Sequence, residues 1–248
     1  MSALRADRHR DATLARSVAL FRAFRTEQAD PAGFYGALAH DSVRQLSALT
    51  ELSGAVILDV GGGPGYFEDA FRNAGAEYLA IDADAGELSA AGTPGPHTIL
   101  GSGMELPVRN AAVDLCYSSN VLEHVRRPWQ MADEMVRVTR PGGYVFLSFT
   151  LWYGPWGGHE TAPWHYLGGT RAADRYARRR GHLPKNVFGE SLFRVTAAEA
   201  LAWARGCRDA DLVDAFPRYL PAWAHGLARV PGLREVALWN LALVLRRR

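Results

Sequence analysis

The feature that most constrains this chain is a short apolar run that ends in a cluster of glycines. Residues 56–60 read VILDV, and residues 61–67 read GGGPGYF. A short apolar run bounded by glycine is typical of a buried parallel strand, and the residues that follow have a helix-like pattern. A glycine turn between a strand and a helix lets the backbone approach a ligand closely, because no side chain intervenes. We therefore predict a strand, a ligand-binding turn and a helix.

Strand and helix patterns alternate from residue 55 to residue 150. The expected strands lie at 55–60, at 77–82, in the segment up to residue 100, at 113–119 and at 144–150. The expected helices lie between them, at 66–75, 86–92 and 127–139. This alternation predicts an α/β fold with a doubly wound, mostly parallel sheet.

The segments on either side of this region have other patterns. Apolar residues at helical spacing in 11–25 and 33–51 predict a helical N-terminal cap over residues 1–54. After residue 150 the alternation stops, and we expect a helix at 197–206 and two closing strands at 211–219 and 239–247. We expect one domain over residues 55–248, with an insertion at about 151–195 between the fifth and sixth strands.

Composition excludes several classes of protein. The formal net charge is only +2, so the chain has no general electrostatic attraction for nucleic acid. Its two cysteines, Cys116 and Cys207, are too few for a disulfide framework or a zinc site. The sequence has neither a signal-peptide pattern nor an apolar run of membrane-spanning length. We expect a cytoplasmic protein.

Three readings of the glycine turn differ in their spacing. The dinucleotide fingerprint G-x-G-x-x-G would need a third glycine at position 66, where the chain has Tyr66. A P-loop would need a lysine followed by serine or threonine, and the turn has no lysine. The remaining pattern is D-x-G-x-G-x-G, formed by Asp59, Gly61, Gly63 and Gly65.

Asp82 ends the next expected strand, about 20 residues beyond the glycines. Ligands of such sheets bind outside the carboxyl ends of the strands, so its carboxylate is placed to accept both hydroxyls of a ribose. This pattern favours a nucleoside without the features expected for a pyrophosphate. A purely structural glycine turn remains the alternative.

Four motifs in order resemble those of a known enzyme family. They are LDVGGGPG, LAIDAD, ELPVRNAAVDLCYSSNVLEHV and RVTRPGGYVFLS. With them the chain resembles the class I S-adenosylmethionine-dependent methyltransferases of the UbiE-like, type 11 group, and as a whole it resembles an uncharacterised actinobacterial methyltransferase group. The resemblance implies a seven-stranded Rossmann-like sheet whose last strand is antiparallel. It implies S-adenosyl-L-methionine as cofactor and S-adenosyl-L-homocysteine as product.

The resemblance also implies a set of cofactor-binding residues. They are Asp59, Gly61, Gly63, Gly65, Asp82, Ser102, Gly103, Met104 and Asn120. Asp59 and the glycines would border the methionine half of the cofactor, and Asp82 would bind the ribose. Ser102 stands where the family often has an acidic residue that receives the adenine amino group, and Met104 either packs on the purine or belongs to the local core. The Asn120 carbonyl would meet the cofactor's amino group.

Methyl transfer from a sulfonium is an in-line displacement that depends mostly on alignment. A base is needed only where the acceptor must lose a proton of high pKa. The candidate bases are His124, which follows the fourth strand, and His159 and His165 in the insertion; a structural role for each histidine stays open. The segment HETAPWH lacks the H-E-x-x-H spacing and contains Pro163, so its local pattern predicts no metal site.

The insertion contains features of an acceptor region. Its aromatic residues, separated by glycines, suit either a lid over an acceptor or a cover for the sheet; they are Trp152, Tyr153, Trp156, Trp164 and Tyr166. Residues 171–182 form a basic helical stretch, which is a solvated face, an anionic-acceptor site or a peripheral contact with an anionic membrane. In the N-terminal cap, Phe34 and Tyr35 are candidates for closure over the cofactor.

We therefore expect a methyltransferase that methylates an oxygen of a small-molecule, lipid-linked or sugar-linked metabolite. Nucleic acid is disfavoured as acceptor, because SSNVLEH stands where base-amino methyltransferases have an Asn/Asp-Pro-Pro-aromatic motif. The alternatives are a nicotinamide-dependent oxidoreductase and a non-catalytic S-adenosylmethionine-binding protein. No sequence pattern indicates the oligomeric state.

Overall fold

A seven-stranded sheet forms the centre of the protein in a computed structural model that describes residues 11–27, 29–89 and 95–248. The strand order is β3-β2-β1-β4-β5-β7-β6. The strands are β1 (Val56–Val60), β2 (Glu77–Asp82), β3 (Thr98–Leu100), β4 (Val113–Ser119), β5 (Thr139–Thr150), β6 (Ala210–Phe216) and β7 (Asn240–Arg247). The first five are parallel, and β7 runs antiparallel to both β5 and β6. The structure confirms the predicted α/β fold, including its antiparallel last strand.

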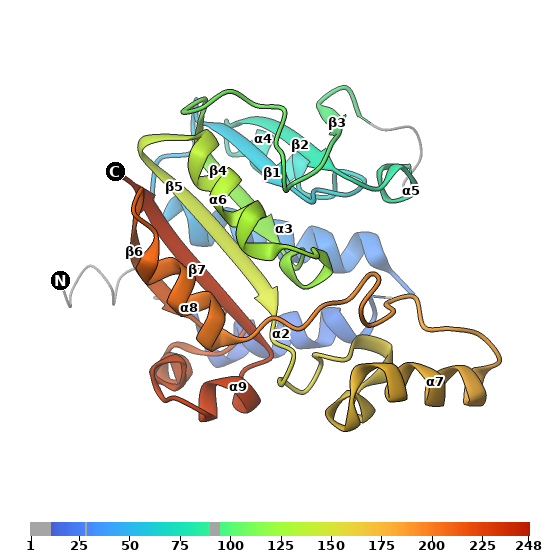
Figure 1. The fold of residues 1–248 in the computed structure, drawn as a ribbon. Coiled ribbons are helices and arrows are strands. Elements are labelled where there is room, and N and C mark those ends of the chain that lie inside the picture. The colour runs from blue at the N-terminus through green and yellow to red at the C-terminus, as the bar shows by residue number, and fades with distance from the viewer. Residues whose placement is uncertain (1–10, 28, 90–94) are drawn as a thin grey trace.

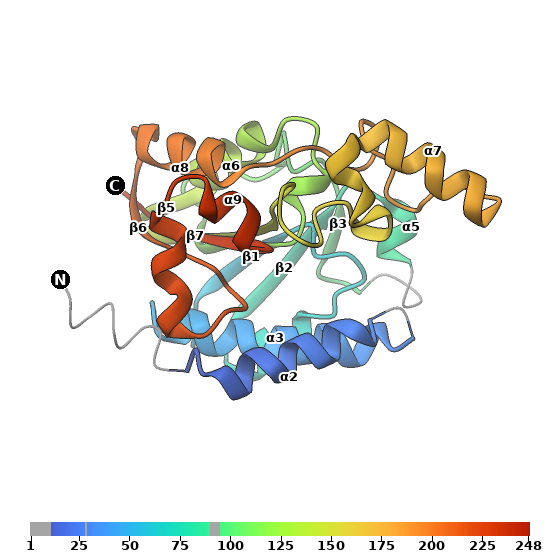
Figure 2. The same cartoon turned by 90° about the horizontal axis from the view of Figure 1, so that it is seen from below.

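Helices cover both faces of this sheet (Figures 1 and 2). The α-helices are α2 (Leu14–Arg25), α3 (Pro31–Ser47), α4 (Glu68–Asn73), α5 (Ala85–Leu88), α6 (Pro128–Val138), α7 (Gly169–Arg180), α8 (Ala197–Gly206) and α9 (Leu233–Ala237). The 3₁₀ segments are η1 (Leu122–His124), η2 (His159–Thr161), η3 (Trp164–Leu167) and η4 (Ala222–Arg229). Helices α6 and α8 lie on one face, and α3 lies on the other with α2 outside it.

Alternating side chains of the central strands supply one core on each face of the sheet. In β4, Cys116 packs in the core shared with α6 and α8, whereas Leu115 and Tyr117 pack in the core shared with α3 and α4. Successive strand residues point to opposite faces, so a strand buried on both sides is apolar throughout. This explains why the central strands are largely apolar, with buried polar residues such as Asp59 and Ser118 toward their carboxyl ends.

The N-terminal helices are begun by side-chain caps and attached to the rest of the chain by polar contacts. Thr13 caps α2, and Asp30 caps α3 with Pro31 in its first turn. Arg16 of α2 forms a buried ion pair with Asp41 of α3 at 2.6 Å, and it also donates to the Arg218 carbonyl at 3.1 Å. These contacts join the two helices to the segment after β6.

Several boundaries differ from the sequence-based expectations. Strand β5 begins at Thr139 and not at 144, because Thr139 already pairs with Val113 of β4, before a register irregularity that precedes the pairing of Tyr144 with Leu115. Strand β6 ends at Phe216, two residues before the buried Arg218. Helix α5 ends at Leu88, and residues 90–92 of the expected helix lie outside the described part of the chain.

The segment between β5 and α8 contains η2, η3 and α7. In both views α7 lies at the end of the molecule opposite β6 (Figures 1 and 2). It ends at Gly181, whose φ of +80° allows the left-handed cap. Across residues 11–27, 29–89 and 95–248, no helix combines the length and the apolar character that a bilayer crossing requires.

Candidate active site

The carboxyl ends of β1, β2 and β4 bring the glycine turn and its predicted partners to one edge of the sheet. After β1 the chain moves outward to β2 and β3, and then returns to place β4 on the other side of β1. Such a reversal opens a crevice beyond the carboxyl ends of the strands, where ligands of doubly wound sheets bind. The predicted cofactor residues lie at or just after the carboxyl ends of β1, β2, β3 and β4.

The glycine turn needs its glycines for two physical reasons. Gly61 and Gly63 have φ values of +81° and +52°, a region that side chains disfavour. In addition, a Cβ atom on Gly61 would overlap the Val121 side chain, which follows β4. The Gly61 N–H donates to the Ile81 carbonyl at 2.7 Å, which anchors the turn to β2.

Asp82 holds the glycine turn directly. One carboxylate oxygen accepts a hydrogen bond from the Gly63 N–H at 2.9 Å, and the other accepts from the Asp84 N–H at 2.9 Å. The side chain is half-buried at the crevice. A carboxylate oxygen has about two acceptor sites, so Asp82 retains capacity for a pair of hydroxyl donors.

Asp59 lies beneath the turn and is only 2 % exposed. Its carboxylate accepts a hydrogen bond from the Tyr78 hydroxyl at 2.8 Å. Burial, assisted by the negative charge of Asp82, raises the pKa of Asp59 to about 7, although the Tyr78 hydrogen bond opposes this shift. Near neutral pH this carboxyl therefore exists in both charge states, and a cation bound nearby would favour its ionised form.

Ser102, Gly103 and Met104 form a half-buried turn after β3. The Ser102 hydroxyl accepts from the Met104 N–H at 3.2 Å, and the Met104 carbonyl accepts from the Gln130 side chain at 2.8 Å. Met104 packs against the core next to α6. The contacts fix the turn at the predicted edge, and they are compatible with either role that the sequence left open for Met104.

Asn120 adopts an unusual backbone conformation and joins distant segments. Its φ is +57°, and its N–H donates to the Ser148 carbonyl at 2.7 Å. Its side-chain oxygen accepts from the Asn240 amide at 2.8 Å, while its side-chain nitrogen donates to the Tyr219 hydroxyl at 3.1 Å. No local pattern indicates this second role of Asn120, because its side-chain partners Tyr219 and Asn240 lie 99 and 120 residues away.

Arg218 is fully buried next to this network, and sequence analysis missed it. Its guanidinium donates to the Ser119 hydroxyl at 2.6 Å, to Ser148 at 2.5 Å, to Ser42 at 2.6 Å and to Tyr117 at 3.0 Å. The charge therefore links the ends of β4 and β5 to α3. The only signal of it in the sequence was an arginine near the end of the strand expected at 211–219.

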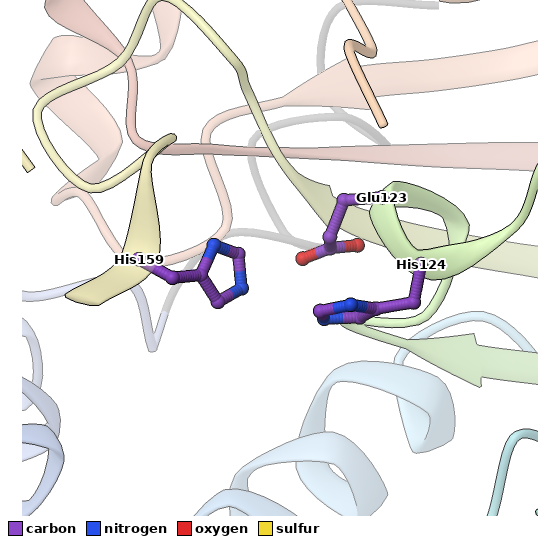
Figure 3. A group of neighbouring side chains, drawn as sticks. All are labelled: Glu123, His124 and His159. Atoms are coloured by element: carbon purple, nitrogen blue, oxygen red, sulfur yellow. The ribbon is translucent and has the colours of Figure 1, made fainter. Parts of the chain in front are cut away.

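The structure brings His124 and His159 together, with Glu123 beside them (Figure 3). The two imidazole centres lie 5.0 Å apart and the rings are nearly perpendicular. Glu123 and His124 belong to η1 after β4, whereas His159 begins η2 in the insertion. Burial lowers the pKa of His159. Sequence analysis missed Glu123, whose neighbour at position 159 is 36 residues away.

His165 lies apart from this cluster in the interior of the insertion. It is 1 % exposed and packs edge-on against Trp152, with ring centres 5.4 Å apart. Burial lowers its pKa as well. This environment favours a packing role for His165.

Aromatic side chains connect the N-terminal helices to the insertion and the glycine turn. Trp156 contacts Phe24 of α2 edge-on at 5.6 Å between ring centres. Tyr35 of α3 stacks on Tyr66 of the glycine turn, with ring centres 5.1 Å apart and an angle of 2° between the planes. The Tyr35 hydroxyl donates to Glu27 at 2.7 Å. The predicted cap thus reaches the predicted cofactor loop.

Part of the insertion surface is both aromatic and basic. Trp164 and Tyr166 are 41 % and 49 % exposed, and Arg175 of α7 lies over the Trp164 ring at 3.8 Å.

A separate cavity of about 620 Å³ lies at the opposite edge of the sheet, where Asn110 precedes β4 and Asp209 precedes β6. That cavity is remote from the predicted cofactor residues.

Comparisons with known proteins agree with this geometry. Residues 58–147 match the family model described as a methyltransferase domain. An uncharacterized methyltransferase of Mycolicibacterium gilvum is 54 % identical over 246 residues, which cover 95 % of each chain. A match of this extent shows common family membership and the methyltransferase class, and it argues against the nicotinamide-dependent alternative.

Solved structures with similar folds have much lower identity. An S-adenosylmethionine-dependent methyltransferase from Mesorhizobium loti has a TM-score of 0.53 at 23 % identity, covering 84 % of this chain and 98 % of its own. The [4+2]-cyclase SpnF has a TM-score of 0.51 at 16 % identity, covering 84 % and 80 %. This fold therefore also occurs in an enzyme named for another reaction, and the assignment rests on the family matches. The chain belongs to the class I S-adenosylmethionine-dependent methyltransferase family.

Proposed function

We propose that the protein binds S-adenosyl-L-methionine at the carboxyl edge of β1, β2 and β4 and transfers its methyl group to an oxygen atom of a small-molecule, lipid-linked or sugar-linked metabolite. The observation that carries the proposal is the contact between Asp82 and the Gly63 N–H at 2.9 Å. This hydrogen bond joins the carboxylate that is predicted to bind a ribose to a glycine turn that lacks the third glycine of a dinucleotide site.

The residues at this edge fit each part of the cofactor. The backbone of Gly61, Gly63 and Gly65 would border the methionine half, and Asp82 would accept the ribose hydroxyls. Asp59 lies beneath the same turn, and its pKa of about 7 allows it to ionise when a cation binds nearby. The turn at Ser102–Met104 would border the adenine.

The bound cofactor supplies a methyl group on a positively charged sulfur, which is already a good leaving group. The protein therefore has to hold the acceptor oxygen in line with that methyl and exclude water. The stacked pair Tyr35 and Tyr66 supports closure by the N-terminal helices, since it places an aromatic cover on the glycine turn. The residues of η2 and η3 would cover the acceptor side.

An acceptor hydroxyl must lose its proton during transfer, and a group near the carboxyl end of β4 is needed to receive it. Glu123, His124 and His159 lie together next to that end. We assign the removal of this proton to these three side chains acting together. His165 is the weaker of the predicted bases, because its imidazole is buried among aromatic rings.

The surface of the insertion supports an acceptor with an apolar part and an anionic part. Exposed rings at Trp164 and Tyr166 offer apolar contact, and the arginines of α7 offer positive charge next to them. A lipid-linked acceptor would combine both features, and it could be reached from an anionic membrane surface. This assignment narrows the acceptor class without naming the compound.

The test uses cofactor whose transferable methyl is isotopically labelled. The purified protein is incubated with separate lipid, small-molecule and nucleic-acid extracts, and labelled products are identified by mass spectrometry. We expect label in an O-methyl group of a lipid or small molecule. Label in nucleic acid would contradict the acceptor class, and cofactor binding without any labelled product would favour the non-catalytic alternative.

A further inference from the structure

We propose that Glu123, His124 and His159 form a binding site for a divalent transition-metal ion of the Zn²⁺ type. Each side chain offers one ligand atom, and these atoms all lie within 4.8 Å of one another. Two imidazole nitrogens and a carboxylate oxygen are a ligand set that Zn²⁺ and neighbouring metals use in proteins. The local segment HETAPWH did not predict this site, because two of its ligands come from η1.

Tertiary structure, and not local spacing, assembles the three ligands. Figure 3 shows the Glu123 carboxylate and the His124 ring facing the His159 ring across a small gap. Glu123 and His124 follow β4, and the Glu123 carbonyl accepts from the Phe193 N–H at 2.7 Å, which attaches them to the segment before α8. His159 approaches from the opposite side with a φ of +49°, a conformation that is uncommon for residues other than glycine.

The hydrogen bonds around the cluster orient it for metal binding. Nδ1 of His124 lies 2.7 Å from the Ser191 carbonyl, so this nitrogen carries the proton and donates it. Its Nε2 atom then keeps a free lone pair. A backbone carbonyl that fixes the tautomer of an imidazole in this way is the usual outer support of a metal-ligating histidine.

One buried acceptor atom in the cluster has no hydrogen-bond partner within the described residues. Glu123 is 2 % exposed, and one of its oxygens accepts from the Thr150 N–H at 2.9 Å while Oε2 has no partner. Buried polar atoms are almost always paired, so this oxygen needs an explanation. A bound cation would satisfy it.

The nature of the ligands limits the ion. Imidazole suits Zn²⁺, Co²⁺ and related ions, whereas Mg²⁺ and Ca²⁺ prefer sets made of oxygen atoms. Three protein ligands leave a coordination position open, as in catalytic zinc sites. On the proposed methyl transfer, this position would take the acceptor oxygen and lower the pKa of its hydroxyl, so that the proton could pass to a water molecule; the three side chains would then act through the ion and not as bases themselves. This last role rests on the proposed function, but metal binding itself does not.

The test is a titration of the full chain, without a polyhistidine tag, after treatment with a chelator. Co²⁺ is the probe, because its visible absorption reports the ligand set, and Zn²⁺ is then added as competitor. We expect one equivalent of Co²⁺ per chain, displaced by Zn²⁺. Absence of saturable Co²⁺ binding by the wild-type protein would overturn the proposal.

Variants connect any observed binding to these residues. We expect His159→Asn and Glu123→Gln each to weaken Co²⁺ binding by more than the roughly 10–100-fold that loss of an outer support costs. His40→Gln, on the exposed surface of α3, is the matched control and should bind as the wild type does. Unchanged binding in a folded His159→Asn protein would overturn the proposal. Because Glu123 is buried, circular dichroism checks the fold of both variants. If Glu123→Gln does not fold, the Co²⁺ affinity of His159→Asn alone decides whether the proposal holds.

The two proposals fail separately. S-adenosylhomocysteine binding is measured on the same preparations by calorimetry. Binding of S-adenosylhomocysteine without Co²⁺ binding would refute the metal site alone. If the protein binds Co²⁺ but does not bind S-adenosylhomocysteine, the metal site is supported and the cofactor assignment is refuted.

Discussion

The buried carboxyl of Asp59 should make the stability of the ligand-free protein depend on pH in a direction opposite to that of a usual aspartate. Its pKa is raised from 3.8 to about 7, mainly by burial. Between these two values the folded state binds more protons than the unfolded state, so the free energy of unfolding falls as pH rises. The contribution is fully present below pH 3.8 and is lost above about pH 7.

The size of the effect follows from the shift. One pKa unit corresponds to about 1.4 kcal/mol, so a rise of roughly three units corresponds to about 4 kcal/mol. Asp59→Asn removes the titration and still offers an oxygen to the Tyr78 hydroxyl. We therefore expect the variant to gain about 4 kcal/mol relative to the wild type between pH 4 and pH 8.

Urea unfolding at a series of pH values measures this difference. Other titrating groups are common to both proteins, so their contributions cancel in the comparison. Asp69→Asn, at an exposed position of α4, is the matched control for the substitution itself. A difference between Asp59→Asn and the wild type that stays constant within about 1 kcal/mol would refute the reasoning.

Two further predictions concern buried features found only in the structure. Arg218→Met leaves four hydroxyl groups without their charged donor, and we expect a loss of about 1.5–3 kcal/mol in urea unfolding. A stability equal to that of the wild type would show that the network contributes little. Gly157→Ala would place a Cβ atom against the Trp152 carbonyl, and we expect thermal and urea unfolding to show a loss of about 1–3 kcal/mol. Gly226→Ala, where a Cβ atom meets nothing within 4 Å, should stay within about 0.5 kcal/mol, and equal effects of the two substitutions would contradict the steric argument.

Local patterns predicted most of the fold because burial on both faces makes the central strands largely apolar. The strand expected at 55–60 is β1 (Val56–Val60), and the strand expected at 113–119 is β4 (Val113–Ser119). The start of β5 at Thr139 was not predictable in this way, because the residues before 144 contain Pro141 and two glycines. Thr139 pairs with Val113 and Tyr144 with Leu115, so the residues between them extend β5 through a register irregularity despite their weak strand propensity.

The candidate site was predictable where it follows the strand ends. Asp59, the glycines and Asp82 stand at fixed distances in the sequence from β1 and β2, and the structure brings them to one edge. Contacts between distant segments were not predictable. The Arg218 network and the group formed by Glu123 and His159 join residues far apart in the chain, and no local spacing encodes them.

The most direct test of the account is a calorimetric titration with S-adenosylmethionine, S-adenosylhomocysteine and NAD. We expect micromolar binding of the first two and no binding of NAD. Asp82→Asn should weaken S-adenosylhomocysteine binding by about 1.5–3 kcal/mol, roughly 10- to 150-fold, while the exposed control Asp69→Asn should leave it unchanged. Binding of NAD alone, or an unchanged dissociation constant in Asp82→Asn, would contradict the assignment of this edge as the cofactor site.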